Sequence, residues 1–162
     1  MGKMKGVSFV LWRTNDMELY QQERYFIDTA VLPLVPVSFG DRIRQLASGY
    51  EWIQMIAGCL ESQFKGRIVL LPAFPYLQQA IPDSAGPAIK SWEAELAESG
   101  FRHIFYLTSD PGWQRLQTEL NGNVLWMPAV PLEHMEQKQR DAIVDEQVKQ
   151  LISTIVRSWG EN

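Results

Sequence analysis

Cysteine is almost absent from this chain of 162 residues, in which Cys59 is the only one. A single thiol excludes an intramolecular disulfide, a CxxC redox pair and a zinc site made of cysteines. The sequence therefore suits a reducing compartment, and we expect a cytoplasmic protein. Histidine is also scarce, with two residues. We predict no metal site and no cofactor.

Long hydrophobic runs are absent as well. The longest uncharged segment, 68–82, has fifteen residues and contains Pro72, Pro75 and Pro82, whereas a membrane span needs roughly 18 or more apolar residues. The apolar run 7–12 is too short for a secretory signal. Basic clusters are missing too, since 15 basic residues stand against 19 acidic ones and give a net charge of -4. We therefore predict neither membrane insertion nor nucleic-acid binding.

The common catalytic and nucleotide-binding motifs do not occur. The sequence has no GxGxxG, GxxxxGK[ST], HExxH or GxSxG pattern. The segment after the first apolar run begins with Trp12 and Arg13 and has no glycine, which argues against a flavin phosphate loop. The apolar run 67–71 ends at Leu71 and Pro72, where a receiver domain would carry a phosphoacceptor aspartate. The dinucleotide-binding, P-loop, zincin, nucleophile-elbow, flavin-binding and receiver architectures therefore lose their local support.

What the sequence has in quantity is apolar material, at 46% of its residues. Short apolar runs alternate with longer segments of helical periodicity, which is typical of βαβ units. We predict strands at 6–12, 30–37, 67–71, 103–108 and 124–127, and helices at 16–28, 41–64, 86–100, 110–121 and 133–159. The prediction is a single α/β domain over 1–162, a three-layer αβα sandwich around a five-stranded parallel sheet.

The prolines suggest an order for these strands. Segment 30–37 contains Pro33 and Pro36, and segment 124–127 runs into Pro128 and Pro131. Proline removes a ladder donor, so it favours edges, ends and bulges. We therefore place these two strands at the edges, in the flavodoxin-like order 2-1-3-4-5. Because residues three apart point their amides to opposite sides, either Pro33 or Pro36 must lie at a bulge or a strand end.

A ligand site in such a sheet lies at the carboxyl ends of the strands, at the point where the strand order reverses. The candidate ligand-binding residues that follow the predicted strands are Trp12, Arg13, Asp16, Ser38, Asp41, Phe74, Tyr76, Ser109, Asp110 and His134. No catalytic residue can be assigned among them from the sequence.

Several of these candidates have two interpretations. Arg13 could bind a carboxylate or phosphate, although a surface pair with Asp16 or another acid is the favoured interpretation. Asp110 and Asp41 could act as acids, but each also precedes a helix, and we favour helix capping for both. For His134 we favour an ordinary surface histidine.

The aromatic residues suggest contact with another molecule. Trp12, Phe74 and Tyr76 could stack on a planar ligand or form a patch for a partner protein. The helix 41–64 carries Trp52, Met55 and Ile56 beside its main apolar stripe. This second apolar face must be buried by the domain or by another subunit, and a homodimer through it is one hypothesis.

Two functions stay open. The first is a non-catalytic binding or regulatory domain that contacts an unidentified protein partner or a small anionic ligand. The alternative is an enzyme acting on a nucleotide or phosphorylated sugar, with Arg13 on the anion, Tyr76 or Trp12 stacking, and Asp110 or Asp41 as acid or base.

The segment 12–39, which begins WRTND and ends YFIDTAVLPLVPVSF, resembles the N-terminal segment of the YpiF-like family. This family comprises small cytoplasmic proteins of spore-forming bacteria. The resemblance extends in length and strand-helix order along most of the chain. It implies a bacterial, soluble protein with an accessory role in respiratory-complex biogenesis, and it implies no catalytic residues.

Overall fold

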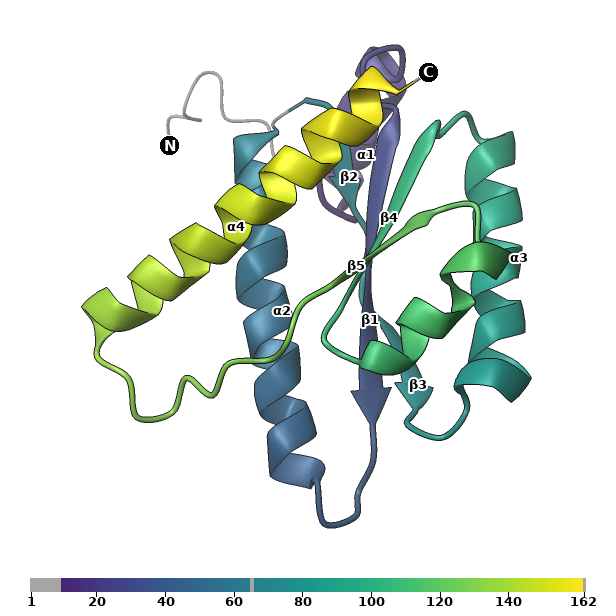
Figure 1. The fold of residues 1–162 in the computed structure, drawn as a ribbon. Coiled ribbons are helices and arrows are strands. Elements are labelled where there is room, and N and C mark those ends of the chain that lie inside the picture. The colour runs from purple at the N-terminus through teal and green to yellow at the C-terminus, as the bar shows by residue number, and fades with distance from the viewer. Residues whose placement is uncertain (1–9, 65, 162) are drawn as a thin grey trace.

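The fold was analysed in a computed structural model, which describes residues 10–64 and 66–161. The elements in chain order are α1 (Thr14–Glu23), β1 (Thr29–Val37), α2 (Ile43–Gln63), β2 (Ile68–Leu70), β3 (Phe74–Leu77), the π-helical turn η1 (Ile81–Ala85), α3 (Gly86–Glu98), β4 (His103–Thr108), the 3₁₀ segment η2 (Pro111–Glu119), β5 (Asn123–Trp126) and α4 (Gln137–Gly160) (Figure 1). The predicted alternation of strands and helices is confirmed, except that β3 was not predicted and follows β2 with no helix between them.

The five strands form one parallel sheet in the order β2-β1-β4-β5, with β3 also beside β1. The predicted α/β class and parallel sheet are therefore confirmed. The observed strand order is close to the predicted one, except that β1 lies between β2 and β4. Placing 30–37 at an edge was wrong. Of the predicted strand 6–12, only residues from Val10 onward are described, and Leu11 forms a bridge to Leu70 beside β2.

An interior strand accommodates the two prolines of β1 because each proline nitrogen faces a place where the hydrogen-bonded ladder is interrupted. Val31 pairs with Leu70, and Leu34 pairs with Phe74. Between these pairs, the two residues 32–33 of β1 stand opposite the three residues 71–73, which join β2 to β3. This is a bulge. The carbonyl of Val31 accepts from Leu71, so Pro33, two residues on, directs its nitrogen towards the same bulged side.

Pro36 directs its nitrogen to the opposite side of β1, towards β4. The register between β1 and β4 ends at Pro33 and Leu107, so Pro36 lies beyond the last paired residues. The expectation that one of the two prolines lies at a bulge or strand end is confirmed. The prolines did not indicate an edge strand, because a bulge and a strand end accommodate proline in an interior strand as well.

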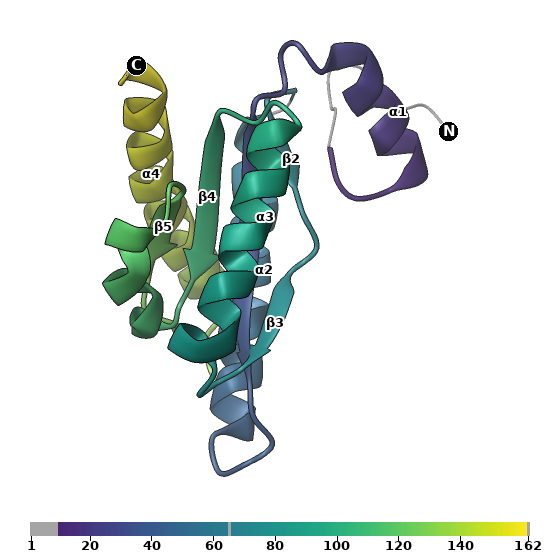
Figure 2. The same cartoon turned by 90° about the vertical axis from the view of Figure 1, so that its right-hand side faces the viewer.

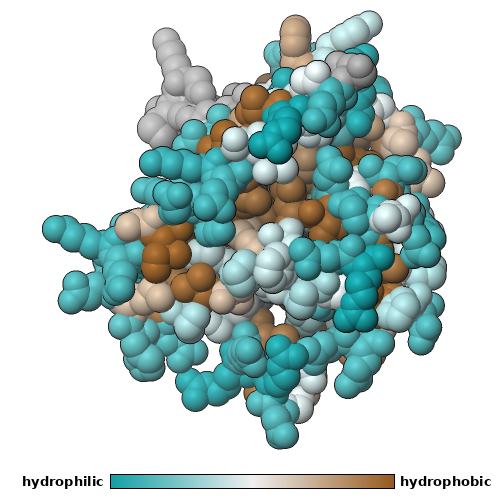
Figure 3. Space-filling model, in the orientation of Figure 1, coloured by the Kyte–Doolittle hydropathy of each residue, from teal (hydrophilic) through white to brown (hydrophobic). Residues whose placement is uncertain are grey.

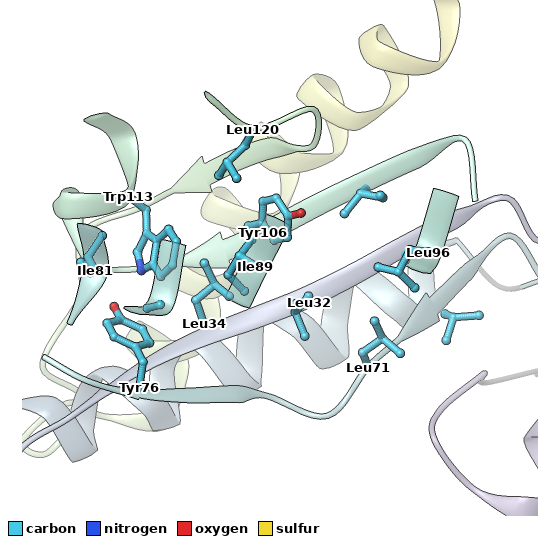
Figure 4. Close-up of a cluster of buried hydrophobic side chains, with 14 of the residues drawn as sticks. Leu32, Leu34, Leu71, Tyr76, Ile81, Ile89, Leu96, Tyr106, Trp113 and Leu120 are labelled. Carbon is cyan, nitrogen blue, oxygen red and sulfur yellow. The ribbon is translucent and has the colours of Figure 1, made fainter. Parts of the chain in front are cut away.

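Helices cover both faces of the sheet. Figure 1 shows α2 and α4 on one side and α3 on the other, and Figure 2 shows α3 in front of the sheet with α2 behind it. The side chains of Ala30, Leu32 and Leu34 pack in the cluster under α3, η1 and η2 (Figure 4), whereas Val31 packs in the cluster under α2 and α4. This alternation follows the two-residue period of a strand. Figure 3 shows hydrophilic residues around most of the outline of the viewed face.

The second apolar face of α2 is covered within the domain. Trp52 and Ile56 have no exposed surface and pack in the same cluster as Val144, Val148 and Leu151 of α4. The surface that we predicted for a homodimer is therefore occupied by α4. The sequence pattern allowed either cover, and the amphipathic α4 supplies it.

The helices follow the predicted positions with small shifts. The helix expected at 41–64 is α2, and the Gly86-Pro87 start is that of α3. The helix expected at 110–121 is the 3₁₀ segment η2. In the part of the chain that the structure describes, no helix has both the length and the apolar character needed to cross a membrane.

Candidate functional site

A cavity of about 320 Å³ lies at the carboxyl ends of β1 and β4, the two neighbouring strands at the centre of the sheet. The chain leaves β1 towards α2 on one face and leaves β4 towards η2 on the other, so this is the point where the strand order reverses. We call this cavity the carboxyl-edge crevice. It is lined by Pro36, Arg42, Gln45, Leu46, Gly49, Gln78, Ser109, Asp110, Pro111, Trp126, Pro128 and Ala129.

Asp110 forms one wall of the crevice, and both of its carboxylate oxygens are engaged. Oδ1 accepts from the backbone N–H of Gly112 at 2.9 Å, and Oδ2 accepts from the hydroxyl of Tyr76 at 2.6 Å. The backbone N–H of Asp110 donates to Oγ1 of Thr108 at 3.0 Å. Asp110 is the N-cap of η2, so the favoured capping interpretation is confirmed.

Tyr76 lies in the core, in the same cluster as Trp113 (Figure 4). Its side chain is 6% exposed and packs edge-on against Trp113, with ring centroids 5.3 Å apart. Burial, followed by the hydrogen bond to Asp110, raises the pKa of Tyr76 far above its ordinary range. Phe74 stacks beside it at 6.4 Å and is partly buried against the same cluster. Both rings serve packing here, because alternate residues of β3 point towards α3.

Arg42 is the only cation among the described residues that line the crevice. It stands at the N-cap of α2, and its Nε donates to Oε1 of Gln45 at 3.1 Å. Among the described residues it forms no ion pair. Its terminal nitrogens can therefore meet an anionic group. The neighbouring Asp41 is exposed and does not cap α2, which has no side-chain cap; the capping prediction for Asp41 was wrong.

Ser109 lies against the backbone of α2. Its Oγ is 3.4 Å from the position that a Cβ on Gly49 would take. Its carbonyl accepts from Nε1 of Trp126 at 3.3 Å. Gly49 thus lets the loop after β4 approach α2 closely and narrows the crevice at this point.

A second hollow of about 410 Å³ adjoins the crevice across Pro36 and Leu46. We call it the α2–β3 groove. Its lining contains no charged residue and consists of Val35, Pro36, Val37, Ser38, Phe39, Ile43, Leu46, Ala47, Tyr50, Ala73 and Pro75. Ser38 accepts from the N–H of Gly40 at 3.2 Å, and Phe39 beside it is 85% exposed. Ser38 therefore shapes the loop at the mouth of the groove.

Three predicted residues lie away from the crevice. Trp12 and Arg13 line a different cavity, beside α1. Asp16 accepts from the backbone N–H of Leu11 at 3.1 Å and forms no ion pair with Arg13. The reason is register, because Leu11 stands beside Leu70, alongside the first half of β1. The carboxyl end of the first strand is therefore several residues short of the crevice.

His134 also lies elsewhere, exposed in the loop before α4 and outside the lining of the crevice and the groove. The structure thus brings together Ser109, Asp110 and Tyr76, with Ser38 close by in the groove. Within residues 10–64 and 66–161, no three His, Cys, Asp or Glu side chains are grouped to hold a metal ion.

Four polar or aromatic lining residues escaped the sequence analysis: Arg42, Gln45, Gln78 and Trp126. Arg42 and Gln78 lie just outside segments that were singled out, next to Asp41 and close to Tyr76. Trp126 lies in the predicted strand 124–127 and was not singled out. The available signal was position, since each residue begins a helix or ends a strand at the carboxyl edge of the sheet.

The chain is similar to known proteins along nearly all of its length. The family described as "Protein of unknown function (DUF2487)" matches residues 18–159. A Bacillus subtilis (strain 168) protein described as "Uncharacterized protein YpiF" is 32% identical over 149 residues, which cover 92% of this chain and 97% of that relative. No solved structure matches the chain significantly. These two matches establish that the chain belongs to the YpiF-like DUF2487 family.

Proposed function

We propose that this protein is a non-catalytic binding domain of regulatory or accessory type, and that its carboxyl-edge crevice holds an anionic group at Arg42. The supporting observation is the guanidinium of Arg42, which forms no ion pair with the described residues and lies on the wall of a cavity of about 320 Å³. A planar guanidinium can bind a carboxylate or phosphate through two hydrogen bonds. The amides of Gln45 and Gln78 add hydrogen-bonding capacity around it.

The character of the ligand follows from the second charge in the crevice. The carboxylate of Asp110 lines the same cavity and repels further negative charge. A ligand with a single anionic group therefore suits the crevice better than a polyphosphate. A small carboxylate and an acidic side chain of a partner protein share this chemistry.

The binding interpretation is favoured over the enzyme because, of the two predicted acids, Asp110 is engaged in hydrogen bonds within the protein and Asp41 does not line the crevice. An acid or base must be free to exchange a proton with its substrate, whereas Asp110 accepts from Gly112 and Tyr76. Arg13, the predicted anion-binding residue of the enzyme, lines a different cavity. The accessory role in respiratory-complex biogenesis stays a prediction from the family resemblance, and a binding domain is compatible with it.

A thermal-shift screen of monocarboxylates, acidic peptides, sugar phosphates and nucleotides tests this proposal. A ligand at a hundred times its Kd adds about 2.7 kcal/mol to the free energy of unfolding. We expect monoanionic compounds to stabilise the wild-type protein, and Arg42→Gln to abolish the shift. Arg13→Gln is the matched control, because it removes an exposed arginine outside the crevice, and it should leave the shift unchanged.

Two results would overturn the proposal. A ligand whose shift survives Arg42→Gln but disappears in Arg13→Gln would assign binding to the cavity beside α1. Turnover of the stabilising compound, followed by NMR of the mixture, would replace the binding domain with the enzyme.

A further inference from the structure

One side of α2 presents an apolar stripe that no described element covers. The stripe consists of Ile43, Ala47 and Tyr50, which line the α2–β3 groove. Ile43 is 42% exposed, Tyr50 is 41% exposed, and Ala47 is exposed as well. The opposite side of the helix carries Trp52 and packs under α4, so this stripe is a separate surface.

The spacing of the stripe is that of a helix pairing with another helix. Its steps of four and three residues are those of d and a positions in a heptad repeat. Ala47, at the central position, has a small side chain and permits two backbones to approach closely. An occupant with the same spacing would place its own apolar side chains against the stripe and the uncharged lining of the groove.

The charges beside the stripe indicate which helix would pair with it. Arg44 and Glu51 are one heptad apart and both follow a d position, so both occupy e positions on the same flank. The other flank holds Leu46 and Ile53, which are buried in the protein's own core. In a parallel pair, e positions face the g positions of the partner, and these are not available here.

In an antiparallel pair of identical helices, e positions face e positions. When two α2 helices cross near Ala47, Arg44 of one copy lies opposite Glu51 of the other, and the contact occurs twice by symmetry. The side chain of Arg44 is 85% exposed and has one ion pair, to Glu133 at 3.5 Å. Glu51 is exposed and has no hydrogen bond or ion pair among the described residues. The charge pattern is thus complementary to itself.

We propose that two copies of this chain associate through antiparallel α2 helices, with the stripe Ile43, Ala47 and Tyr50 at the centre and the Arg44–Glu51 contacts on its flank. The stripe spans about two helical turns, so the interface lies at the small end of specific interfaces, about 1,200 Å² or less in total. The dimer should form at micromolar concentration. It does not depend on a ligand in the carboxyl-edge crevice, which lies on the other side of Leu46.

Sedimentation velocity of the full chain over a concentration series from low to high micromolar measures the association. We expect a monomer–dimer equilibrium for the wild-type protein. Ala47→Arg should leave a monomer throughout the series, because it places a charge at the centre of the stripe without altering the core. Gln63→Arg is the control, since it adds the same charge at the exposed end of α2 and should not change the dimer.

Charge exchange separates this contact from a role within one molecule. Arg44→Glu and Glu51→Arg should each weaken association by about tenfold, because each brings like charges together at both symmetric contacts. The double variant restores opposite charges and should recover the wild-type dimer. Arg44→Glu breaks the ion pair to Glu133 in both the single and the double variant, so recovery cannot come from that pair.

A wild-type monomer at every concentration would overturn the proposal. An unchanged dimer in Ala47→Arg, or a double variant no better than the single variants, would overturn it equally. Thermal unfolding of each variant shows whether the fold is intact, and these exposed substitutions are expected to preserve it.

Discussion

Two buried tyrosines couple the stability of this protein to alkaline pH. Tyr76 is 6% exposed and Tyr106 is fully buried. Burial raises the pKa of both hydroxyls, and the carboxylates of Asp110 and Glu93, respectively, raise it further. The folded protein therefore keeps both protons at a pH at which an unfolded chain releases them.

The pH dependence follows from this difference. Below pH 10 both the folded and the unfolded state hold the protons, so the two tyrosines contribute fully to the free energy of unfolding. Above the ordinary tyrosine pKa of about 10, the unfolded state loses protons that the folded state retains, and the free energy of unfolding falls by about 1.4 kcal/mol per pH unit for each group. Urea unfolding between pH 8 and pH 11, followed by circular dichroism, should show this decline. Tyr76→Phe and Tyr106→Phe should each remove the contribution of one tyrosine to this decline. Equal slopes of the free energy of unfolding against pH in all three proteins would contradict the assignment.

Single residues also show where sequence reasoning succeeds. The capping role of Asp110 was predictable because a cap depends on the few residues that follow it. The position of Arg13 depended on the register of its strand against Leu70, which no local pattern specifies. Asp41 and Asp110 both precede a helix, but they are followed by different residues, and only Asp110 caps its helix.

At the scale of elements, two glycines have opposite surroundings. A Cβ on Gly58, in the interior of α2, would meet no atom within 4 Å. A Cβ on Gly122, in the turn before β5, would lie 2.7 Å from Cε2 of Tyr106 and 2.9 Å from the carbonyl of Ile104. Gly122 is therefore required by the close approach of β4, whereas Gly58 only weakens its helix.

Alanine at these two positions should change stability in opposite directions. We expect Gly58→Ala to raise the free energy of unfolding by about 1 kcal/mol, because alanine is the better helix former. Gly122→Ala should lower it by about 1–3 kcal/mol through overpacking. Urea denaturation of the two variants beside the wild type measures both. A destabilised Gly58→Ala would mean that α2 contacts another surface at this point.

The elements themselves were largely predictable, and their arrangement was not. Periodicity identifies α2 and α4 because each has a continuous apolar stripe. Pro33 and Pro36 could not reveal that β1 lies between β2 and β4. The bulge that accommodates Pro33 is formed by residues 71–73, in the segment that joins β2 to β3. The crevice was predicted at the correct edge of the sheet, but the predicted strand order put it between the strands 6–12 and 67–71, whereas it lies at the ends of β1 and β4.

At the scale of the whole molecule, α4 is attached unevenly. Its buried residues begin at Val144 and continue to Ile155. At its end, Nε1 of Trp159 donates to Oγ1 of Thr29 at 2.9 Å, and the guanidinium of Arg67 lies 3.7 Å above the ring. The first two turns bury no side chain, so the helix is anchored from Val144 onward.

Hydrogen exchange should reveal this difference. We expect amides in 148–158 to be protected nearly as well as those of β4, and amides in 141–143 to exchange much faster. Trp159→Ala should cost about 2–4 kcal/mol and reduce the protection of the carboxyl half. Uniform protection along α4 in the wild-type protein would contradict this description.

The contact between Trp159 and Thr29 joins residues 130 positions apart. During synthesis on the ribosome, α2 emerges long before the helix that covers it. Trp52 and Ile56 must therefore remain exposed on the nascent chain until translation is almost complete. A chain that terminates before α4 would present this apolar face permanently, and it is the species on which chaperones and proteases should act.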